Sequence, residues 1–440
     1  MRTADLGRAL RGVLDAAEGA SPVEAVESVT RELGASLGAT HVSFLVADLS
    51  GRALVRMTHA PLAGPAPAAR TEGDGTPEDD RSDGEESATS LPFDGGPAEQ
   101  ALRSQTVQVL PPGAAYGGGR PQDLWMVLAP VTERGEAIGL IELSLPSEPS
   151  AEVQDEIART ALVLAYVVIA SRRHTDLFEW GQRSIPFSLS AEIQRRLLPS
   201  AFTCEARAVT LSAWLEPAAS VGGDTFDYIL GRDALHLSIT DAMGHGVASA
   251  LTATLCTASL RNARRHGGSL VDQAAAANTA LTENQTSGPD EGFATGLLGR
   301  LDLRTGVLSL VNAGHVLPLL ARGGAVAPVD LPVGLPFGMF PDVAHEVADV
   351  ELLPGDRLVL VTDGMVERNA GDVDIASMIS ETRALHPREA TRALSDAVIS
   401  ASGTALADDA TLLVLDWHGD HGSDRQSSYG AETARASSAH

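Results

Sequence analysis

Hydrophobic and polar positions follow two different periods along the first part of the chain. Apolar residues recur at helical spacing over residues 4–36 and again over 150–174, which predicts helices at both ends of this part. Between them lie runs rich in branched and aromatic residues, which predict strands at 40–47, 52–59, 106–110, 124–131 and 137–145. Helices that enclose a set of strands indicate a compact α+β module.

A second, larger region starts near residue 206 and combines many short strands with two groups of helices. The helices are predicted at 246–265, at 269–285 and as a pair within 374–402. The strands are predicted at 207–214, 226–230, 234–241, 294–302, 307–313, 316–321, 357–362 and 411–416. This mixture predicts two packed β-sheets flanked by helices, so the fold class is α+β in both regions.

A helical connection joins the two regions. In its sequence SLSAEIQRRLLPS, Leu189, Ile193 and Leu197 are spaced four residues apart, which predicts one apolar helical face that packs on the second region or on another copy of the chain. The predicted division is an N-terminal helix at 1–19, a first domain at 20–172, a linker at 173–200, a second domain at 201–418 and a tail at 419–440.

Two segments carry too few apolar residues to form a core. Residues 71–87 contain eight acidic residues and one arginine, which predicts a disordered, solvated insertion near 62–92 in the first domain. The residues from 419 to 440 are mostly small and polar and predict a disordered tail.

The charge balance narrows the classes of partner. The chain of 440 residues has 32 basic and 58 acidic residues and a net charge of −26. This excess of acid argues against binding to nucleic acid, which needs cations on the phosphates, and against docking on an anionic membrane. Every basic residue is arginine, so the lysine chemistry of Walker-type phosphate loops and of Schiff bases is excluded.

Cysteine usage and hydropathy indicate a cytoplasmic protein. Only Cys204 and Cys256 are present, which disfavours a disulfide framework or a cysteine-rich zinc site. The N-terminal sequence lacks the apolar core of a signal peptide. The most apolar run, residues 160–171, is too short to span a bilayer and predicts a buried helix.

Acidic residues at the predicted strand ends are the candidate chemistry of the second domain. They are Asp224 in SVGGDTFDY, Asp241 in LSITDAMGHG, Asp363 in RLVLVTDGMVE, and Asp408 with Asp409 in LADDATLLVLDW. One such acid beside glycine is normally only a turn. Together they predict a site for hard divalent cations such as Mg²⁺ or Mn²⁺, which prefer oxygen ligands, and not for zinc.

The first domain resembles a GAF domain, a sensor and dimerisation fold for small ligands. The resemblance rests on THVSFLVADLSGRALVRMTHA and LAPVTERGEAIGLIELSL and covers roughly residues 20–172. It implies a GAF-like sensor that controls the second domain. The apolar helix at 160–171 further predicts a homodimer formed through this sensor and the linker helix, since a second copy would cover its excess apolar surface.

The second domain resembles the PP2C-type, metal-dependent protein serine/threonine phosphatases, and within them the bacterial SpoIIE/RsbU branch. The resemblance covers about residues 190–417 and implies an α-β-β-α sandwich. It rests on IQRRLLP, VGGDTFDY, DAMGHG, GFATGLLGRLDLRTGVLSLVNAGHVLPLL, LPFGMF, LPGDRLVLVTDGMVE and DDATLLVL, in that order.

The resemblance assigns roles to individual residues. Asp224 and Asp241 would bind two Mn²⁺ or Mg²⁺ ions, with Asp224 bridging them. The carbonyl of Ala242 would be a further ligand, and Asp363 would bind the first ion. In the last acidic pair, Asp408 is preferred as the ligand. Asp409 is a candidate of the same set, either a partner that supports a ligand or a strand cap. The family often has valine and lysine within the DAMGHG segment, where this chain has Ala242 and His245.

The implied activity is hydrolysis of a phosphoserine or phosphothreonine ester by a metal-activated water. The implied substrate is a phosphorylated regulatory protein, of the STAS type that antagonises anti-sigma factors in partner switching. Two alternatives remain open, a non-catalytic ligand-gated interaction module and a nucleotide-processing two-metal enzyme. His245 and His315 are candidate proton donors, although a local hydrogen bond in the turn for His245 and a strand-end position for His315 are favoured.

Overall fold

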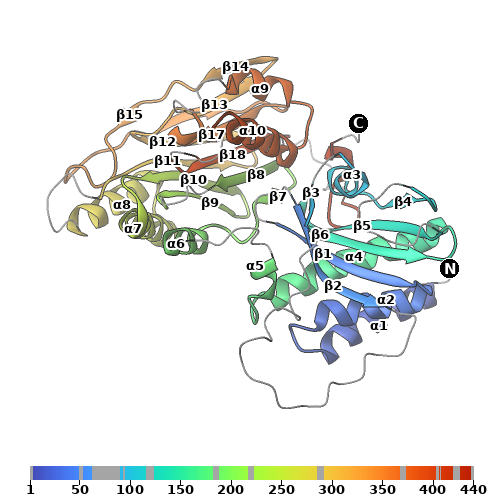
Figure 1. Ribbon diagram of the computed structural model, residues 1–440. Helices are drawn as coiled ribbons and strands as arrows, with labels where there is room; N and C mark the ends of the chain where they lie inside the picture. Colours follow the sequence, from blue (N-terminus) through green and yellow to red (C-terminus); the bar gives the residue numbers. More distant parts are fainter. Residues whose placement is uncertain are drawn as a thin grey trace, which may run out of the picture. The chain divides into compact units, whose positions relative to one another are not determined.

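The computed structural model describes residues 3–48, 53–61, 90–92, 95–114, 123–181, 188–216, 222–284, 292–366, 373–402, 406, 408–419 and 427–437. The chain divides into two compact units (Figure 1). Unit 1 contains Met1–Ile185 together with Ser427–His440, and unit 2 contains Pro186–Gln426. No helix in the described part of the chain is long and apolar enough to cross a membrane.

Unit 1 is built on a six-stranded antiparallel sheet with the order β3-β2-β1-β6-β5-β4. All five strands expected from the sequence are present, and β3 was not expected. The strands are β1 His41–Ala47, β2 Ala53–Pro61, β3 Ser90–Pro92, β4 Gln108–Leu110, β5 Trp125–Glu133 and β6 Glu136–Leu145.

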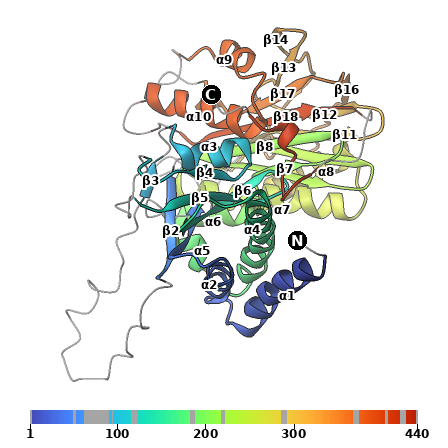
Figure 2. The same ribbon diagram turned by 90° about the vertical axis from the view of Figure 1, so that its right-hand side faces the viewer.

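Helices cover both faces of this sheet (Figure 2). One face packs against α1 Thr3–Gly19, α2 Ala25–Leu37 and α4 Ala151–Ser171 through a core that includes Phe44 and Leu164. The other face packs against α3 Pro97–Ser104. The expected helical stretch at 4–36 is thus two helices, separated around the predicted start at Ser21-Pro22.

The predicted acidic insertion is shorter than expected at its C-terminal end. Leu91 pairs with Leu54 of β2 as part of strand β3. Residues 62–89, which contain the acidic run, lie outside the described residues.

The prediction of a disordered tail is wrong for residues 427–437, which pack on unit 1. The amide of Gly135 donates to the carbonyl of Gly430 over 3.0 Å, and Ala431 is buried. Gly430 has a φ of +97°, and a Cβ there would lie 1.9 Å from the carbonyl oxygen of Thr132. Composition missed this contact because it depends on the absence of a side chain at Gly430, not on apolar bulk.

Unit 2 is a sandwich of two sheets. One sheet has the order β15-β12-β11-β10-β9, with β16 on β12, and the other has the order β14-β13-β17-β18-β8-β7. The strands are β7 Thr203–Glu205, β8 Val209–Glu216, β9 Asp224–Leu230, β10 Ala234–Ala242, β11 Ala294–Asp302, β12 Val307–Ala313, β13 Leu319–Arg322, β14 Ala325–Pro328, β15 Val333–Gly334, β16 Ala348–Glu351, β17 Arg357–Val361 and β18 Ala410–Trp417. The short strands β7, β14, β15 and β16 were not expected.

Three cores hold the layers of unit 2 together. Phe226, Ile239 and Leu413 belong to the core between the two sheets. Helices α7 Gly246–Arg265 and α8 Leu270–Asn284 cover the outer face of the β9–β12 sheet. Helices α9 Ile375–Glu381 and α10 Pro387–Ser402 cover the outer face of the β17–β18 sheet (Figure 1). The expected α-β-β-α sandwich is therefore confirmed.

The linker contains two short helices, α5 Leu177–Gly181 and α6 Leu189–Leu197. The predicted apolar face of α6 is wrong for Leu189 only, since Leu197 packs on a core of unit 2 and Ile193 is half-buried. Leu189 is 66% exposed, and the buried residues of α6 are Ser190, Ala191 and Gln194. A Cβ on Gly222 would lie 2.9 Å from the Cβ of Ser190. At the start of α6 a small residue faces unit 2, because the helix approaches Gly222 closely at Ser190.

The contact of the C-terminal segment with unit 1 predicts a stabilising role. We expect that ending the chain at Gly419 lowers the melting temperature of unit 1 by several degrees, because the burial around Ala431 is lost (about 1–2 kcal/mol). Differential scanning calorimetry measures this change, with a chain ending at Ser437 as the control. Equal melting temperatures for all three chains would show that the segment contributes nothing.

Candidate functional site

The two sheets bring the predicted acidic residues to one end of the sandwich. Asp224 begins β9 and lies opposite Asp241, the second-last residue of β10, in the antiparallel register. Asp363 follows the end of β17, and Asp408 with Asp409 precedes β18. Because β17 and β18 are also antiparallel neighbours, these three acids share one end of the second sheet.

Asp224 connects the two sheets. Its Oδ2 accepts hydrogen bonds from Oγ1 of Thr362, at 2.7 Å, and from Oγ1 of Thr411, at 2.6 Å. Thr411 also donates its amide to Oγ1 of Thr362. The carboxylate of the first sheet is therefore positioned by hydroxyls of the second sheet, and the side chain of Asp224 is only 2% exposed.

Asp409 joins the linker helix to the start of β9. Its Oδ2 accepts from Nε2 of Gln194 at 2.7 Å, from the amide of Gly223 at 3.0 Å and from the amide of Asp224 at 3.3 Å. The same Nε2 donates to the carbonyl of Asp224 at 2.8 Å. One oxygen of Asp409 is thus committed to protein donors, and Gln194 is 1% exposed.

Asp408 lies beside Asp363 and is less buried than Asp409. Its Oδ1 accepts the amide of Asp409 at 2.8 Å. Partial burial and the charge of Asp363 raise the pKa of Asp408, although this hydrogen bond acts in the opposite direction. The two acids of the pair therefore differ, since Asp408 faces another carboxylate and Asp409 faces hydrogen-bond donors.

Burial raises the pKa of Asp224 well above its ordinary value, and the nearby charges of Asp241 and Asp409 raise it further. The hydroxyls of Thr362 and Thr411 lower it and only partly offset these effects. A buried carboxylate among like charges is unfavourable when ionised. A cation bound against these acids would remove this cost.

Glycines allow the backbone segments of the site to approach one another. A Cβ on Gly223 would lie 2.4 Å from the carbonyl oxygen of Ala242, and one on Gly364 would lie 2.0 Å from that of Asp409. Gly244 and Gly246 have φ values of +103° and +72° and turn the chain from β10 into α7. The glycines near Asp224, Asp241 and Asp363 are therefore required by the geometry of the site.

The two candidate histidines lie in different surroundings. His315 is buried, its Nδ1 lies 2.7 Å from Oγ1 of Thr295, and burial lowers its pKa to about 4. It is therefore neutral at physiological pH and cannot act as an imidazolium proton donor. His245 precedes α7 and is exposed, but its side chain does not cap the helix, unlike the local hydrogen bond favoured from the sequence.

The donor chemistry of the site fits hard divalent cations. Carboxylates and the carbonyl of Ala242, which Gly223 approaches closely, are oxygen donors of the kind that Mg²⁺ and Mn²⁺ prefer. Within the described ranges, no three aspartate, glutamate, histidine or cysteine side chains form a cluster tight enough for one ion. The residues therefore match such ions by chemistry, without forming a closed ligand cluster.

Sequence reasoning missed the residues that position the acids. Thr362, Thr411 and Gln194 hold Asp224 and Asp409 through the hydrogen bonds described above. Thr362 and Thr411 stand next to the acids in VTDG and DDAT, and Gln194 stands in IQRRLLP. The signal for Gln194 was its position as a polar residue in a helix that was expected to present an apolar face.

Part of unit 2 is similar to a known protein family. Residues 231–418 match the family described as Stage II sporulation protein E (SpoIIE). Asp241, Asp363, Asp408 and Asp409 lie inside this match, whereas Asp224 and Gln194 precede it.

Similar proteins include two curated relatives and a solved domain. Protein IcfG of Synechocystis sp. is 25% identical over 212 residues, 42% of this chain and 33% of IcfG. Phosphoserine phosphatase RsbU of Bacillus subtilis is 22% identical over 233 residues, 52% of this chain and 68% of RsbU. The SiaA-PP2C domain of Pseudomonas aeruginosa is 21% identical, with 52% of this chain and 93% of that domain covered and a TM-score of 0.44.

The similarity covers about half of the chain and part of its relatives. The match spans about a third of IcfG and about two thirds of RsbU. The family match ends with β18, and the acids at 241, 363 and 408–409 fall at the strand ends that the fold brings together. The family match therefore shows similarity to SpoIIE over residues 231–418, which is less than half of this chain.

Proposed function

We propose that unit 2 is a metal-dependent protein serine/threonine phosphatase. The observation that carries this proposal is the convergence of Asp224 and Asp241 from one sheet with Asp363 and Asp408 from the other, in a segment that largely overlaps the SpoIIE match. All the candidate acids are present, which disfavours the alternative of a non-catalytic interaction module. No further observation favours a nucleotide-processing enzyme.

The chain's own residues would prepare the site for hydrolysis. Two divalent ions, when bound, would supply a water of lowered pKa and charge compensation for the phosphoryl oxygens. Asp224, Asp241, Asp363 and Asp408 would hold these ions. Thr362 and Thr411 fix one oxygen of Asp224 by direct hydrogen bonds.

Covalent catalysis by cysteine is disfavoured. Burial raises the pKa of Cys256 to about 12, so its thiol is not ionised at physiological pH. Cys204 is partly buried in the short strand β7. The proposed reaction therefore proceeds by direct attack of water on phosphorus, without a phosphoenzyme.

The proposed substrate is a phosphoserine or phosphothreonine on a regulatory protein, of the STAS type that antagonises anti-sigma factors. RsbU, which is named a phosphoserine phosphatase, supports this choice together with the SpoIIE resemblance. The first unit would then act as a GAF-like sensor that controls the phosphatase. Its α+β fold, with helices on both sheet faces, is compatible with that role.

Activity should depend on a divalent ion and on the acids. We expect that Asp241→Asn and Asp363→Asn each lower hydrolysis of a phosphoserine peptide at least about a hundredfold, because the charge that holds the ions is reduced. Phosphate release in Mn²⁺ measures this, with circular dichroism to show that the fold is kept. Asp233→Asn, at an exposed position, is the matched control. A chelated sample as active as the Mn²⁺-loaded one would disprove the mechanism.

Gln194 should act as a positioning residue. Gln194→Ala removes the amide that donates to both Asp409 and the carbonyl of Asp224, at a cost of about 1–3 kcal/mol in folding stability. We expect a higher Mn²⁺ concentration for half-maximal activity, because the start of β9 is less well fixed. Arg196→Ala, on the exposed side of α6, is the control. An unchanged Mn²⁺ requirement would assign Gln194 a purely structural role.

The proposed homodimer would form through α4 and the linker. Tyr166 and Ile169 of α4 are exposed, as is Leu189 of α6, and a second copy would cover these side chains. A shift of α6 could then alter the site through Gln194, whereas a passive tether would not.

The dimer has a direct test. We expect the full-length chain to be dimeric in light scattering and Ile169→Asp to be monomeric, because a charge in an apolar interface is costly. Glu152→Gln, at an exposed position of the same helix, should remain dimeric. A wild-type chain that is monomeric at every concentration would rule out this assembly.

A further inference from the structure

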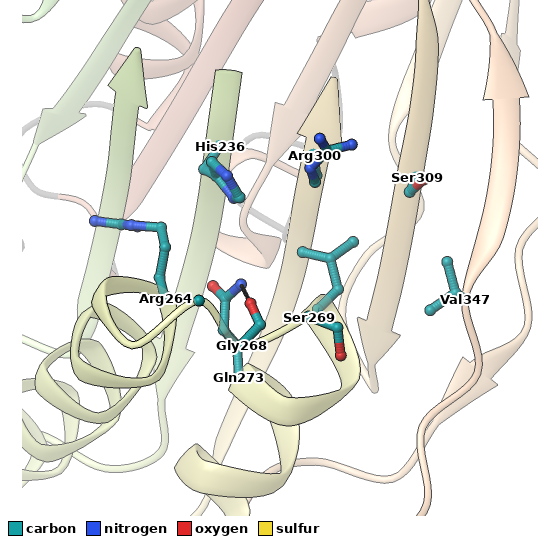
Figure 3. A pocket seen from close by; sticks show the side chains of 10 residues that line it. His236, Arg264, Gly268, Ser269, Gln273, Arg300, Ser309 and Val347 are labelled. Carbon is teal, nitrogen blue, oxygen red and sulfur yellow. Dashed lines mark hydrogen bonds between the residues drawn. The ribbon is translucent and has the colours of Figure 1, made fainter. Parts of the chain in front are cut away.

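A cavity lies in unit 2, on the face of the β9–β12 sheet that α7 and α8 cover. Its volume is about 390 Å³. It is bounded by the sheet and by the turn that connects α7 to α8 (Figure 3). The residues on which the argument depends are His236, Arg264, Ser269, Gln273, Arg300 and Ser309.

The antiparallel register brings the polar groups of the cavity into one row. His236 of β10 lies opposite Arg300 of β11, and Arg300 lies opposite Ser309 of β12. Directly opposed residues point to the same face of a sheet. Leu235 and Leu237 belong to the core between the sheets, so His236 faces the helical side.

Most polar groups of the cavity have partners within the protein. Arg264 donates to Asp227 of β9, and Figure 3 shows its guanidinium turned away from His236. Gln273 donates to the carbonyl of Gly268, and Ser309 donates to Asp349 at 2.6 Å. The amide and hydroxyl of Ser269 donate to Asp272.

Two groups differ from this pattern. Nδ1 of His236 is buried and has no hydrogen-bond partner. Arg300 is exposed and forms no ion pair with any residue in the described ranges. The unpartnered nitrogen of His236 is unfavourable because it is buried. The imidazole and the nearby guanidinium of Arg300 together are suited to an anion.

The surroundings of His236 favour the neutral form of its ring. Burial lowers the pKa of His236, and Arg264 and Arg300 lower it further. The acids near the cavity are engaged elsewhere, Asp227 with Arg261 and Arg264, Asp349 with Ser309, and Asp272 with Ser269. An anion bound between His236 and Arg300 would oppose the effect of both arginines and raise this pKa.

We propose that this cavity is a binding site for a phosphate group, either free phosphate or a small phosphate monoester, held by Arg300 and His236. Arginine and histidine donate to phosphate oxygens, and the volume accommodates a small organic body beside Leu270 and Val347. The site is separate from the acidic site, since His236 precedes Asp241 by five residues of one strand, about 17 Å. It does not depend on the proposed phosphatase activity.

The site can be tested by following the ring of His236 in the full-length protein. Selectively labelled histidine is observed by NMR while inorganic phosphate, phenyl phosphate or acetate is added, with and without Mg²⁺. We expect phosphate to raise the titration midpoint of His236, and acetate to have less effect. Tighter binding of phenyl phosphate would identify the ligand as a monoester, and equal binding would identify it as the free ion.

Variants separate binding at this cavity from binding at the acids. Arg300→Gln should weaken the response of His236 at least about tenfold, whereas Arg304→Gln, at a nearby exposed position, should not. The melting temperature gives a second readout. Phosphate should raise it less in His236→Gln than in the wild type. A His236 ring that does not respond to phosphate, or an Arg300→Gln protein that responds like the wild type, would overturn the proposal.

Discussion

The hydrogen bonding of the buried Asp224 carboxylate is the interaction on which the structure of unit 2 depends. It belongs to one sheet, yet both of its short hydrogen bonds come from threonines of the other sheet. The two halves of the sandwich are therefore aligned by a polar contact at the site as well as by the apolar core between them. Such a contact is directional, whereas apolar packing tolerates small shifts, so the site itself fixes how the sheets meet.

The same end of the sandwich is also where the linker helix enters. Gln194 donates to Asp409 and to the backbone of Asp224 at once, and it is a neutral group among acids. The helix can approach because Ser190 and Gly222 are small. The rest of α6 is held by Leu197, which packs on a core of unit 2, and by Arg261, which donates to the carbonyl of Leu197.

Much of this arrangement could be predicted from the sequence. The strand pattern located Asp224, Asp241, Asp363 and Asp408 at strand ends, because apolar alternation and glycine positions are local properties. The sequence did not predict which residues of α6 are buried. Leu189 is exposed and Gln194 is buried, because Gln194 forms hydrogen bonds to residues far along the chain. The sequence also did not predict the hydrogen bonds from Thr362 and Thr411 to Asp224, or the packing of Gly430. These contacts form between segments that are distant in the sequence. Short strands such as β15, which pairs with β12 through only two residues, have too little pattern to be recognised.

Because residues 427–437 belong to unit 1, the chain connects the two units twice. In sequence, unit 2 is an insertion within unit 1 and not a domain appended to it. Unit 2 is therefore anchored at both of its ends, which makes a closed loop of chain with fewer accessible arrangements than a single tether allows. One proteolytic cut in either connection leaves the two units joined. A conformational change in unit 1 can also reach unit 2 from two directions, through α6 and through β18.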